Sequence, residues 1–273
     1  MALAVCATPI GNLDDVTLRV LSELRDADVV LCEDTRHTRA LLSRHGISAR
    51  LLSYHEHNEA RRSAEMLPRL RAGERMALVS DAGLPGVSDP GARLVAAALE
   101  ARVPVTVLPG PSAVETALVA SGFGAARYQF VGYLPRAERA RAALWQELAR
   151  WPWPVVAFES PRRLPSTLSS LARAMPERTV AVCRELTKRF EEVVRGSAEE
   201  VAGRFTDAPK GEITLVLGGA DSAAETAADE DQALAAVAEL VAAGFGRRQA
   251  AELVARLTGV GRNRLYDATL TNS

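Results

Sequence analysis

The first third of the chain alternates short apolar runs with stretches in which leucine, valine and alanine recur at helical spacing. Strands are predicted at 2–8, 29–33, 50–54, 76–80 and 105–109. Helices are predicted at 15–27, 38–46, 58–73 and 89–101. Because strands and helices alternate, this segment is expected to form a parallel sheet covered by helices.

A second block of the same kind follows a helix expected over 113–120. Its strands are predicted at 128–134, 154–160, 179–186 and 212–219, and its helices at 137–149, 163–174 and 197–205. Residues 191–197 would add a hairpin strand, so the second sheet is expected to be mixed. Residues 220–232 are acidic and lack apolar periodicity, which indicates a linker, and the remainder predicts helices separated by glycine turns. The domains predicted are 1–118, 119–220 and a helical module over 232–273.

Composition indicates a globular protein with a substantial core. Of its 273 residues 48% are hydrophobic, yet no apolar run approaches the ~20 residues needed to span a bilayer. The N-terminus has no basic segment of a signal peptide, and Cys6, Cys32 and Cys183 are isolated in apolar runs, so reduced thiols and a cytoplasmic location are expected. The net charge of −1 means that nucleic acid would have to bind through local basic patches.

Three rigid loops follow predicted strands, at 9–12, 80–86 and 109–113. None carries the GxGxxG of a dinucleotide fold, and no Walker A sequence is present. Ligands of open α/β sheets bind at the carboxyl ends of strands, so these loops are expected to line one binding edge.

The stretch VSDAGLPGVSDPG (79–91) nearly repeats itself. Its second half is expected to start a helix, with Asp89 as the N-cap and Pro90 in the first turn. Its first half precedes the helix and is interpreted as a ligand surface. Only the first copy is therefore predicted to bind.

Two charged loops in the second block carry candidate chemistry: FESPRR (158–163) and RELTKRFEE (184–192). Surface ion pairs are the simpler interpretation of the second. Lys188 argues for more, because it and Lys210 are the only lysines among 33 basic residues, and lysine can lose its proton when its pKa is depressed. The four histidines show no metal-ligand spacing, and no metal is expected.

Several motifs together resemble the ribosomal RNA small subunit methyltransferase I family, which belongs to the tetrapyrrole-methylase-like S-adenosylmethionine (SAM) methyltransferases. They are TPIGNLDD, CEDTRHTRALLSRHGI, YHEHNE, SDAGLPGVSDPG, LPGPSA, FVGYLPR, FESPRR, RELTKRFEE and KGE. They run in order over about 1–220, and the tail resembles the family's helix-turn-helix-like module. The resemblance implies two α/β domains with SAM in the cleft between them, a homodimer, and 2′-O-methylation of a cytidine in 16S rRNA.

The resemblance also implies which residues bind SAM: Pro9, Ser80, Asp81, Ala82, Gly83, Ser112, Ala113, Phe158 and Leu186. The sequence departs from the family pattern at Arg162, where a histidine often follows ESP. A catalytic imidazole is excluded there, and contact with the RNA backbone becomes the expected role.

Methyl transfer to a ribose hydroxyl calls for a positioned base. Lys188 is favoured as base or as hydrogen-bonding orienter, supported by Glu159 and Glu185, and Asp34 is a further candidate. RNA would be held by Arg36, Arg136, Arg162, Arg163, Arg247, Arg248, Arg262 and Arg264. Two alternatives stay open: a small-molecule methyltransferase acting on a tetrapyrrole or corrinoid, and a non-catalytic RNA-binding assembly factor.

Overall fold

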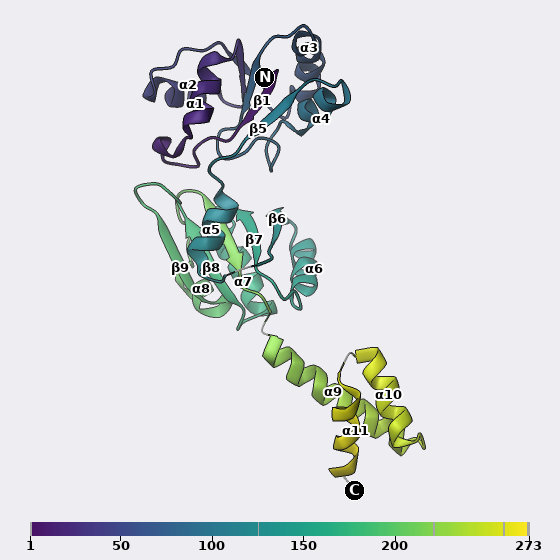
Figure 1. Cartoon of the computed structure of the whole chain (residues 1–273). Helices are drawn as coiled ribbons and strands as arrows, with labels where there is room; N and C mark the ends of the chain where they lie inside the picture. The colour runs from purple at the N-terminus through teal and green to yellow at the C-terminus, as the bar shows by residue number, and fades with distance from the viewer. Residues whose placement is uncertain (1, 125, 221, 259, 272–273) are drawn as a thin grey trace. The chain divides into compact units, whose positions relative to one another are not determined.

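The computed structural model describes residues 2–124, 126–220, 222–258 and 260–271. It divides into two compact units, one formed by 1–149 with 153–218 and the other by 150–152 with 219–273 (Figure 1). The first unit contains two sheets, and the second contains three helices. Among the described residues no helix is long and apolar enough to cross a membrane.

The first sheet is wholly parallel, with the strand order β3-β2-β4-β1-β5. Its strands are β1 (Leu3–Cys6), β2 (Val29–Cys32), β3 (Leu51–Ser53), β4 (Met76–Val79) and β5 (Val105–Leu108). Its helices are η1 (Leu13–Asp15), α1 (Leu18–Asp26), α2 (Thr35–Arg44), α3 (Glu59–Arg71) and α4 (Ala92–Glu100). Because β4, β1 and β5 are neighbours, the three rigid loops after them leave the same edge of the sheet, as the sequence predicts.

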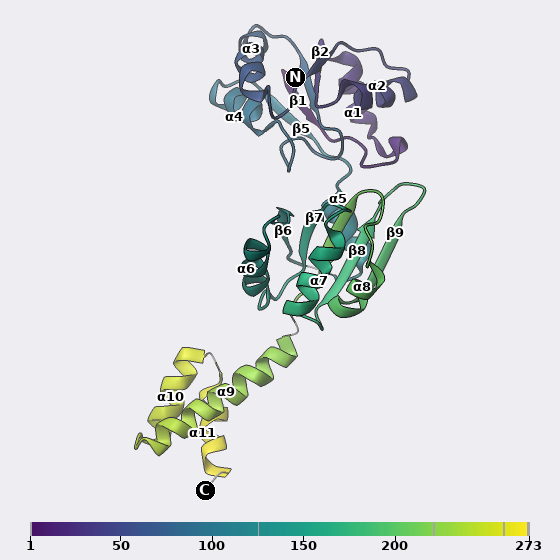
Figure 2. The same ribbon diagram turned by 180° about the vertical axis from the view of Figure 1, so that it is seen from behind.

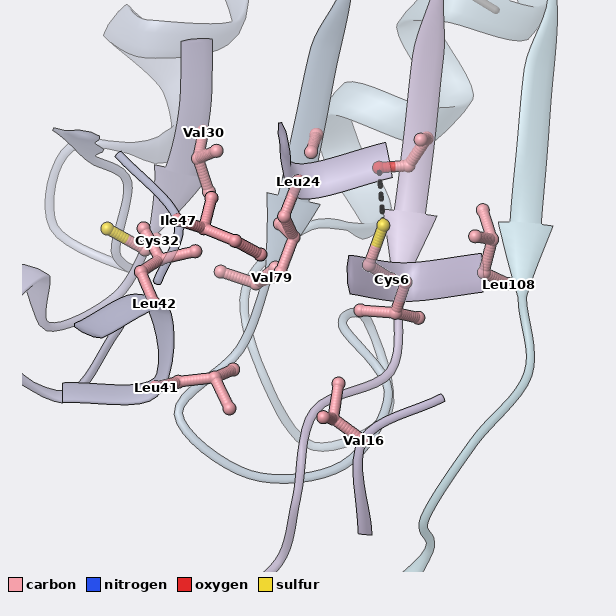
Figure 3. Packing of buried hydrophobic residues seen from close by; sticks show 13 residues of the cluster. Cys6, Val16, Leu24, Val30, Cys32, Leu41, Leu42, Ile47, Val79 and Leu108 are labelled. Carbon is pink, nitrogen blue, oxygen red and sulfur yellow. Dashed lines mark hydrogen bonds between the residues drawn. The ribbon is translucent and has the colours of Figure 1, made fainter. Parts of the chain in front are cut away.

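Side chains of the first sheet alternate between two cores, because successive strand residues point to opposite faces. Cys6, Val30 and Val79 pack with α1 and α2 on one face, where Leu24, Leu41 and Leu42 are buried (Figure 3). Val5, Leu31 and Leu78 pack with α3 and α4 on the other face. All four helices are thereby fixed, and the strand ends that carry the loops are held rigidly.

The second sheet is mixed, as predicted, with the order β6-β7-β10-β8-β9. Only β6 and β7 run parallel, and residues 192–197 form the expected hairpin with β8. Its strands are β6 (Gln129–Tyr133), β7 (Val155–Glu159), β8 (Thr179–Arg184), β9 (Glu192–Ser197) and β10 (Ile213–Leu217). Its helices are α5 (Ala113–Ser121), α6 (Glu138–Leu148), α7 (Leu164–Ala174) and α8 (Ala198–Arg204).

Helix α5 follows β5 in the chain but packs with the second sheet. Its Val114, Ala117 and Leu118 lie in one apolar cluster with Val156 of β7 and Val216 of β10. Figures 1 and 2 show α5 on one face of this sheet, with α7 and α8 on the opposite face. A domain boundary at residue 118 would cut this helix, so a boundary before α5 describes the packing better.

The second unit is built from α9 (Ser222–Ala242), α10 (Arg247–Thr258) and α11 (Arg262–Thr271). Val237, Val254 and Leu265, one from each helix, are almost fully buried in its core. The prediction of a linker over 220–232 is wrong from residue 222 onward, because this alanine-rich acidic stretch is the first part of α9. Asp221 and Gly259, which belong to the predicted linker and second glycine turn, lie outside the described residues.

Candidate active site

A cavity of about 790 Å³ lies in the first unit, where the loops of the first sheet meet the second sheet. Its walls come from the loops after β4 and β5, from β6 and β7, from the loop between β8 and β9, and from the start of β10. This is the size of cavity that holds cofactors and small substrates in other proteins. The site predicted at the strand ends therefore coincides with a real hollow.

The loops after β1 and β4 are joined by backbone hydrogen bonds. Thr8 N–H donates to the Gly83 carbonyl at 2.8 Å, and Gly83 N–H donates back to Thr8 at 3.1 Å. The buried Ser80 hydroxyl donates to the carbonyl oxygens of Ala82 and Gly83 at 3.2 and 3.0 Å. Gly83 has φ +78°, which an L side chain rarely adopts. Ser80 and Thr8 thus fix the loop that presents Asp81 to the cavity.

Asp81 ties the loop after β4 to the start of α2. One carboxylate oxygen accepts from the Asp34 backbone N–H at 3.0 Å, and the other lies 3.4 Å from His37 Nδ1. Asp34 itself is engaged by Arg36, whose hydrogen bonds hold the pKa of this carboxyl well below its usual range. Asp34 is therefore anionic, and its carboxylate is already hydrogen-bonded to Arg36, so it is poorly suited to accept a proton from a substrate.

The prediction that Asp89 caps the next helix is wrong. Helix α4 begins at Ala92, its N-cap position is Gly91, and no N-cap side-chain hydrogen bond forms. Instead, Oε1 of Glu59 from α3 accepts from the Gly91 and Arg93 N–H groups at 3.0 and 3.4 Å. Because a residue distant in the sequence supplies the cap, Asp89 is released to the cavity wall. Both halves of the near-repeat therefore line the cavity.

Burial raises the pKa of Asp89 to about 6, and the negative charges of Glu33 and Asp81 act in the same direction. The nearby Ser80 hydroxyl opposes this increase only in part. The pKa of Glu33 is raised as well, by burial first and then by Asp81. Asp81 and Asp89 thus line the cavity together, and Glu33, which is not part of the wall, is close enough to raise the pKa of Asp89.

The loop after β5 forms another wall of the cavity, and its backbone passes close to Ala7, just after β1. A β-carbon on Gly110 would stand 2.9 Å from the β-carbon of Ala7. Ser112 occupies the N-cap position of α5, as expected, but its hydroxyl donates to Glu115 instead of capping the backbone. Glu115 also accepts from Tyr128 at 2.5 Å, and although burial opposes ionisation, these two hydrogen bonds lower its pKa.

Lys188 lies in the loop between β8 and β9 and forms two ion pairs. Its Nζ is 2.9 Å from Glu185 and 3.2 Å from Glu212, the residue immediately before β10. Burial favours loss of the proton, but the two carboxylates outweigh it and the pKa of Lys188 is raised. A lysine that acts as a base needs a depressed pKa. The raised pKa of Lys188 contradicts that role and makes this residue a cation at neutral pH.

Glu159 and Arg163 form a buried ion pair that supports the cavity floor. The Glu159 side chain is fully buried and accepts from Thr167 at 2.6 Å, from the Ser160 N–H at 2.6 Å and from Arg163. Arg163 also donates to the Leu134 carbonyl at 2.8 Å. The expected RNA contact of Arg163 does not fit this geometry, and both carboxylate oxygens of Glu159 are hydrogen-bonded within the protein.

The family model of the Tetrapyrrole (Corrin/Porphyrin) Methylases matches residues 2–202. A curated relative from Micromonospora olivasterospora, "Ribosomal RNA small subunit methyltransferase I", is 46% identical over 97% of this chain and 85% of its own. The chain belongs to the ribosomal RNA small subunit methyltransferase I family.

Two further comparisons show how much of the chain other proteins share. A Thermotoga maritima relative of the same name is 43% identical over 80% of this chain and 98% of its own, so that protein is shorter by about the length of the second unit. A crystal structure of uroporphyrin-III C-methyl transferase from Thermus thermophilus matches 79% of this chain and 96% of its own, with a TM-score of 0.56 at 22% identity. That likeness concerns the fold alone.

Seven of the nine residues at which the family resemblance places the cofactor line the cavity. They are Asp81, Ala82, Gly83, Ser112, Ala113, Phe158 and Leu186. Ser80 lies behind the wall and shapes it through its hydrogen bonds. Pro9 is buried in the loop after β1 and does not line the cavity, whereas its neighbour Ile10 does.

The predicted RNA-binding arginines differ in how free their guanidinium groups are. Arg136 and Arg162 are exposed, and Arg36 is exposed but paired with Asp34. Arg247, Arg248, Arg262 and Arg264 are exposed on α10 and α11 of the second unit. The described residues bring together no group of three or more histidine, cysteine or acidic side chains able to hold a metal ion.

The sequence interpretation missed Asp89, Tyr133 and Glu212, all of which line the cavity. A signal existed for Asp89, since it repeats Asp81 within the same loop. The placement of Tyr133 follows from the structure: strand β6 shifts register between Phe130 and Tyr133, at a glycine with φ +68°. Such bulges redirect a side chain, often beside an active site.

Proposed function

We propose that this chain is a SAM-dependent methyltransferase that modifies the 2′-hydroxyl of a cytidine ribose in 16S rRNA of the small ribosomal subunit. The observation that carries the proposal is the coincidence of seven family-implied cofactor residues with the walls of one cavity. Relatives named ribosomal RNA small subunit methyltransferase I support the rRNA substrate.

The residues of the cavity fit SAM. Asp81 and Asp89 give one end negative charge, which suits the ammonium and sulfonium groups of the cofactor. Gly83 and Ala82 leave backbone groups accessible, and Phe158 and Leu186 offer apolar surface to the remainder. SAM supplies the methyl group, activated by its bond to a sulfonium sulfur.

The chief contribution of the protein to such a transfer is alignment. The ribose oxygen, the methyl carbon and the sulfur must lie in line, and fixing this geometry can supply about 7–11 kcal/mol of the barrier reduction. Loops fixed as tightly as those of Thr8, Ser80 and Gly83 provide this kind of preorganised wall.

Lys188 and Glu185 act in this proposal as a positioning pair. The protonated Lys188 has one donor to spare beyond its two carboxylate partners, because an ammonium carries three N–H groups. Glu185 and Glu212 hold Lys188 in place. Its positive charge then faces the RNA, and a phosphate or ribose oxygen accepts a hydrogen bond from it.

The second unit and the exposed arginines supply further RNA contacts, and the protein acts as a homodimer. Arg136 and Arg162 flank the second sheet, while Arg248 and Arg262 lie on the second unit. In this proposal the second unit has an accessory role, in substrate binding and not in methyl transfer. Light scattering of the purified protein tests the dimer, and a monomeric mass would refute it.

The decisive experiment offers labelled SAM with three substrates: small ribosomal subunits lacking the modification, naked 16S rRNA and free tetrapyrroles. Transfer to small subunits supports the proposal. Transfer to tetrapyrroles alone would establish the small-molecule methyltransferase instead, and RNA binding without any transfer would establish the assembly factor.

A further inference from the structure

Five carboxyl groups line the cavity, and four of them are occupied by donors within the protein. Glu159 accepts from three groups, Glu115 from Ser112 and Tyr128, Glu212 pairs with Lys188, and Asp81 accepts from the Asp34 N–H and faces His37. A carboxylate whose lone pairs are taken by fixed donors is a poor proton acceptor, because each hydrogen bond stabilises its ionised form.

Asp89 differs from these four. The Ser80 hydroxyl lies near it but donates its proton to the Ala82 and Gly83 carbonyls. The charged groups that face Asp89 are Glu33 after β2 and Asp81 in the loop after β4, both acidic. Tyr133 faces it from β6 and is held neutral, since burial and the nearby carboxylates raise the pKa of its phenol. Ser88, immediately before Asp89, has φ +59°, an uncommon conformation for serine that is typical of functional loops.

The position of Tyr133 indicates which part of a bound RNA would lie beside Asp89. Its side chain lines the cavity, yet 64% of the residue is exposed. The Phe158 ring packs edge-on against it with centroids 5.5 Å apart, and Arg163 holds the next residue through the Leu134 carbonyl. A rigid, exposed aromatic ring at a cavity mouth suits a splayed-out nucleobase, which single-stranded RNA binders commonly stack on such rings.

We infer that Asp89 is the general base of the reaction and that Tyr133 stacks on the target base to bring its ribose over Asp89. This assignment rests on the proposed function. The ribose 2′-oxygen forms a bond to the methyl carbon while the carbon–sulfur bond breaks and its electron pair stays on sulfur. The hydroxyl proton passes to the Asp89 carboxylate and then to solvent.

The environment of Asp89 suits this role. Burial beside Glu33 and Asp81 brings its pKa to about 6, close to the operating pH, where a base is both ionised and basic enough to accept a proton. Tyr133 and the Ser80 hydroxyl stay neutral near pH 7, so the groups with raised pKa to consider here are Asp89 and its neighbour Glu33.

Single-turnover methylation of small subunits, followed from pH 5 to 9, tests the assignment with wild-type protein and three variants. The wild-type rate should rise about tenfold per pH unit below pH 6 and level off above it. Asp89→Asn should lose about 10²- to 10⁴-fold in rate, and the pH dependence with it. Asp89→Glu should restore part of the rate, and the matched change Asp207→Asn, on an exposed loop, should alter nothing.

Tyr133 is tested by the concentration dependence of the same reaction. Tyr133→Phe should react like wild type, whereas Tyr133→Leu should raise the RNA concentration for half-maximal rate about tenfold. Calorimetric SAM binding by each variant shows whether the cavity is still formed.

The outcomes separate the two proposals. A wild-type protein that methylates no RNA overturns the proposed function and this role with it. An active wild type together with an Asp89→Asn variant that keeps SAM binding and more than half of the rate overturns the base assignment alone. If Asp89→Asn fails to bind SAM, the wild-type pH profile decides, and a rate independent of pH between 5 and 8 overturns the assignment.

Discussion

Gly11 lies directly against Lys188: a β-carbon added to Gly11 would stand 2.5 Å from Cγ of Lys188 and 2.9 Å from the Leu186 carbonyl oxygen. The neighbouring Asn12 N–H donates to the Thr187 hydroxyl at 3.1 Å. Two loops separated by some 175 residues are thus interlocked, which places the ion pairs of Lys188 beside the loop after β1.

Gly11→Ala should therefore disturb both loops. Lys188 can swing away, but the Leu186 backbone cannot, so the overpacking is expected to cost about 1–3 kcal/mol of unfolding free energy. Thermal or urea unfolding measures this. Gly203→Ala in α8 is the control, since nothing lies within 4 Å of its added β-carbon, and equal effects of the two changes would contradict the interlock.

Lys188→Met should keep SAM binding and lower methylation by about 100-fold, because the variant removes a fixed positive charge without disturbing the cofactor walls. Lys210→Met, which changes the chain's other lysine on an exposed turn, should be close to wild type. Near-normal turnover of Lys188→Met would remove Lys188 from the site.

Alanine substitutions of the adjacent Arg162 and Arg163 should have different effects, one on RNA binding and the other on stability. Arg163→Ala leaves Glu159 buried without its cation, which is expected to cost about 3–5 kcal/mol of stability. Arg162→Ala removes an exposed charge and should leave stability unchanged while weakening RNA binding.

Unfolding measurements and RNA titrations over a range of salt separate these two effects. Each lost phosphate contact reduces the slope of log K against log salt by about 0.7 to 0.9. If Arg162→Ala were the unstable variant and Arg163→Ala the weak binder, the placement of the two side chains would be wrong.

Asp89 should make stability depend on pH. Because burial, Glu33 and Asp81 raise its pKa to about 6 in the folded state, the native protein binds this proton more tightly than the unfolded chain. Its contribution is therefore fully present below the unfolded pKa near 4 and is lost as pH rises to about 6.

Asp89→Asn removes the titrating carboxyl and, with it, the loss of folding stability as pH rises to about 6. The variant should be more stable than wild type by about 1–2 kcal/mol at pH 8, after allowance for solvent screening, and the gain should vanish below pH 4. Urea unfolding at both pH values measures it. A variant that is less stable at pH 8 than at pH 4, relative to wild type, would contradict the raised pKa.

The second unit should contribute RNA affinity without affecting SAM binding. The double change Arg248→Ala and Arg262→Ala removes two exposed charges of α10 and α11 and should weaken binding to small subunits and flatten its salt dependence. Arg204→Ala, an exposed arginine at the end of α8, serves as the control. Unchanged affinity of the double variant would exclude the second unit from RNA binding.

The sequence predicts the order of elements well because each strand and helix is decided locally. Apolar runs such as 76–80 are buried on both faces of the sheet, and helices such as α1 bury one stripe, so their periodicities are distinct. The linker prediction over 220–232 failed for a local reason too, since the absence of an apolar face was given more weight than the high helix propensity of alanine and glutamate.

The details of the site depend on contacts between distant residues, which a single sequence does not reveal. Glu59 from α3, not Asp89, accepts from the first N–H groups of α4, and Lys188 stays protonated because Glu185 and Glu212, the latter just before β10, pair with it. Residues whose placement depends on their loop, such as Asp81 and Gly83, line the cavity at the predicted strand ends. Those whose role depends on a partner elsewhere, such as Glu159 and Arg163, were misjudged.

The nucleoside content of 16S rRNA tests the central claim most directly. Purified protein is incubated with SAM and unmodified small subunits, and the rRNA is digested and analysed by mass spectrometry. The proposal predicts one new 2′-O-methylcytidine per subunit, absent with Lys188→Met and present with Lys210→Met. A methyl group on a base, or no new methylated nucleoside in the presence of bound SAM, would contradict it.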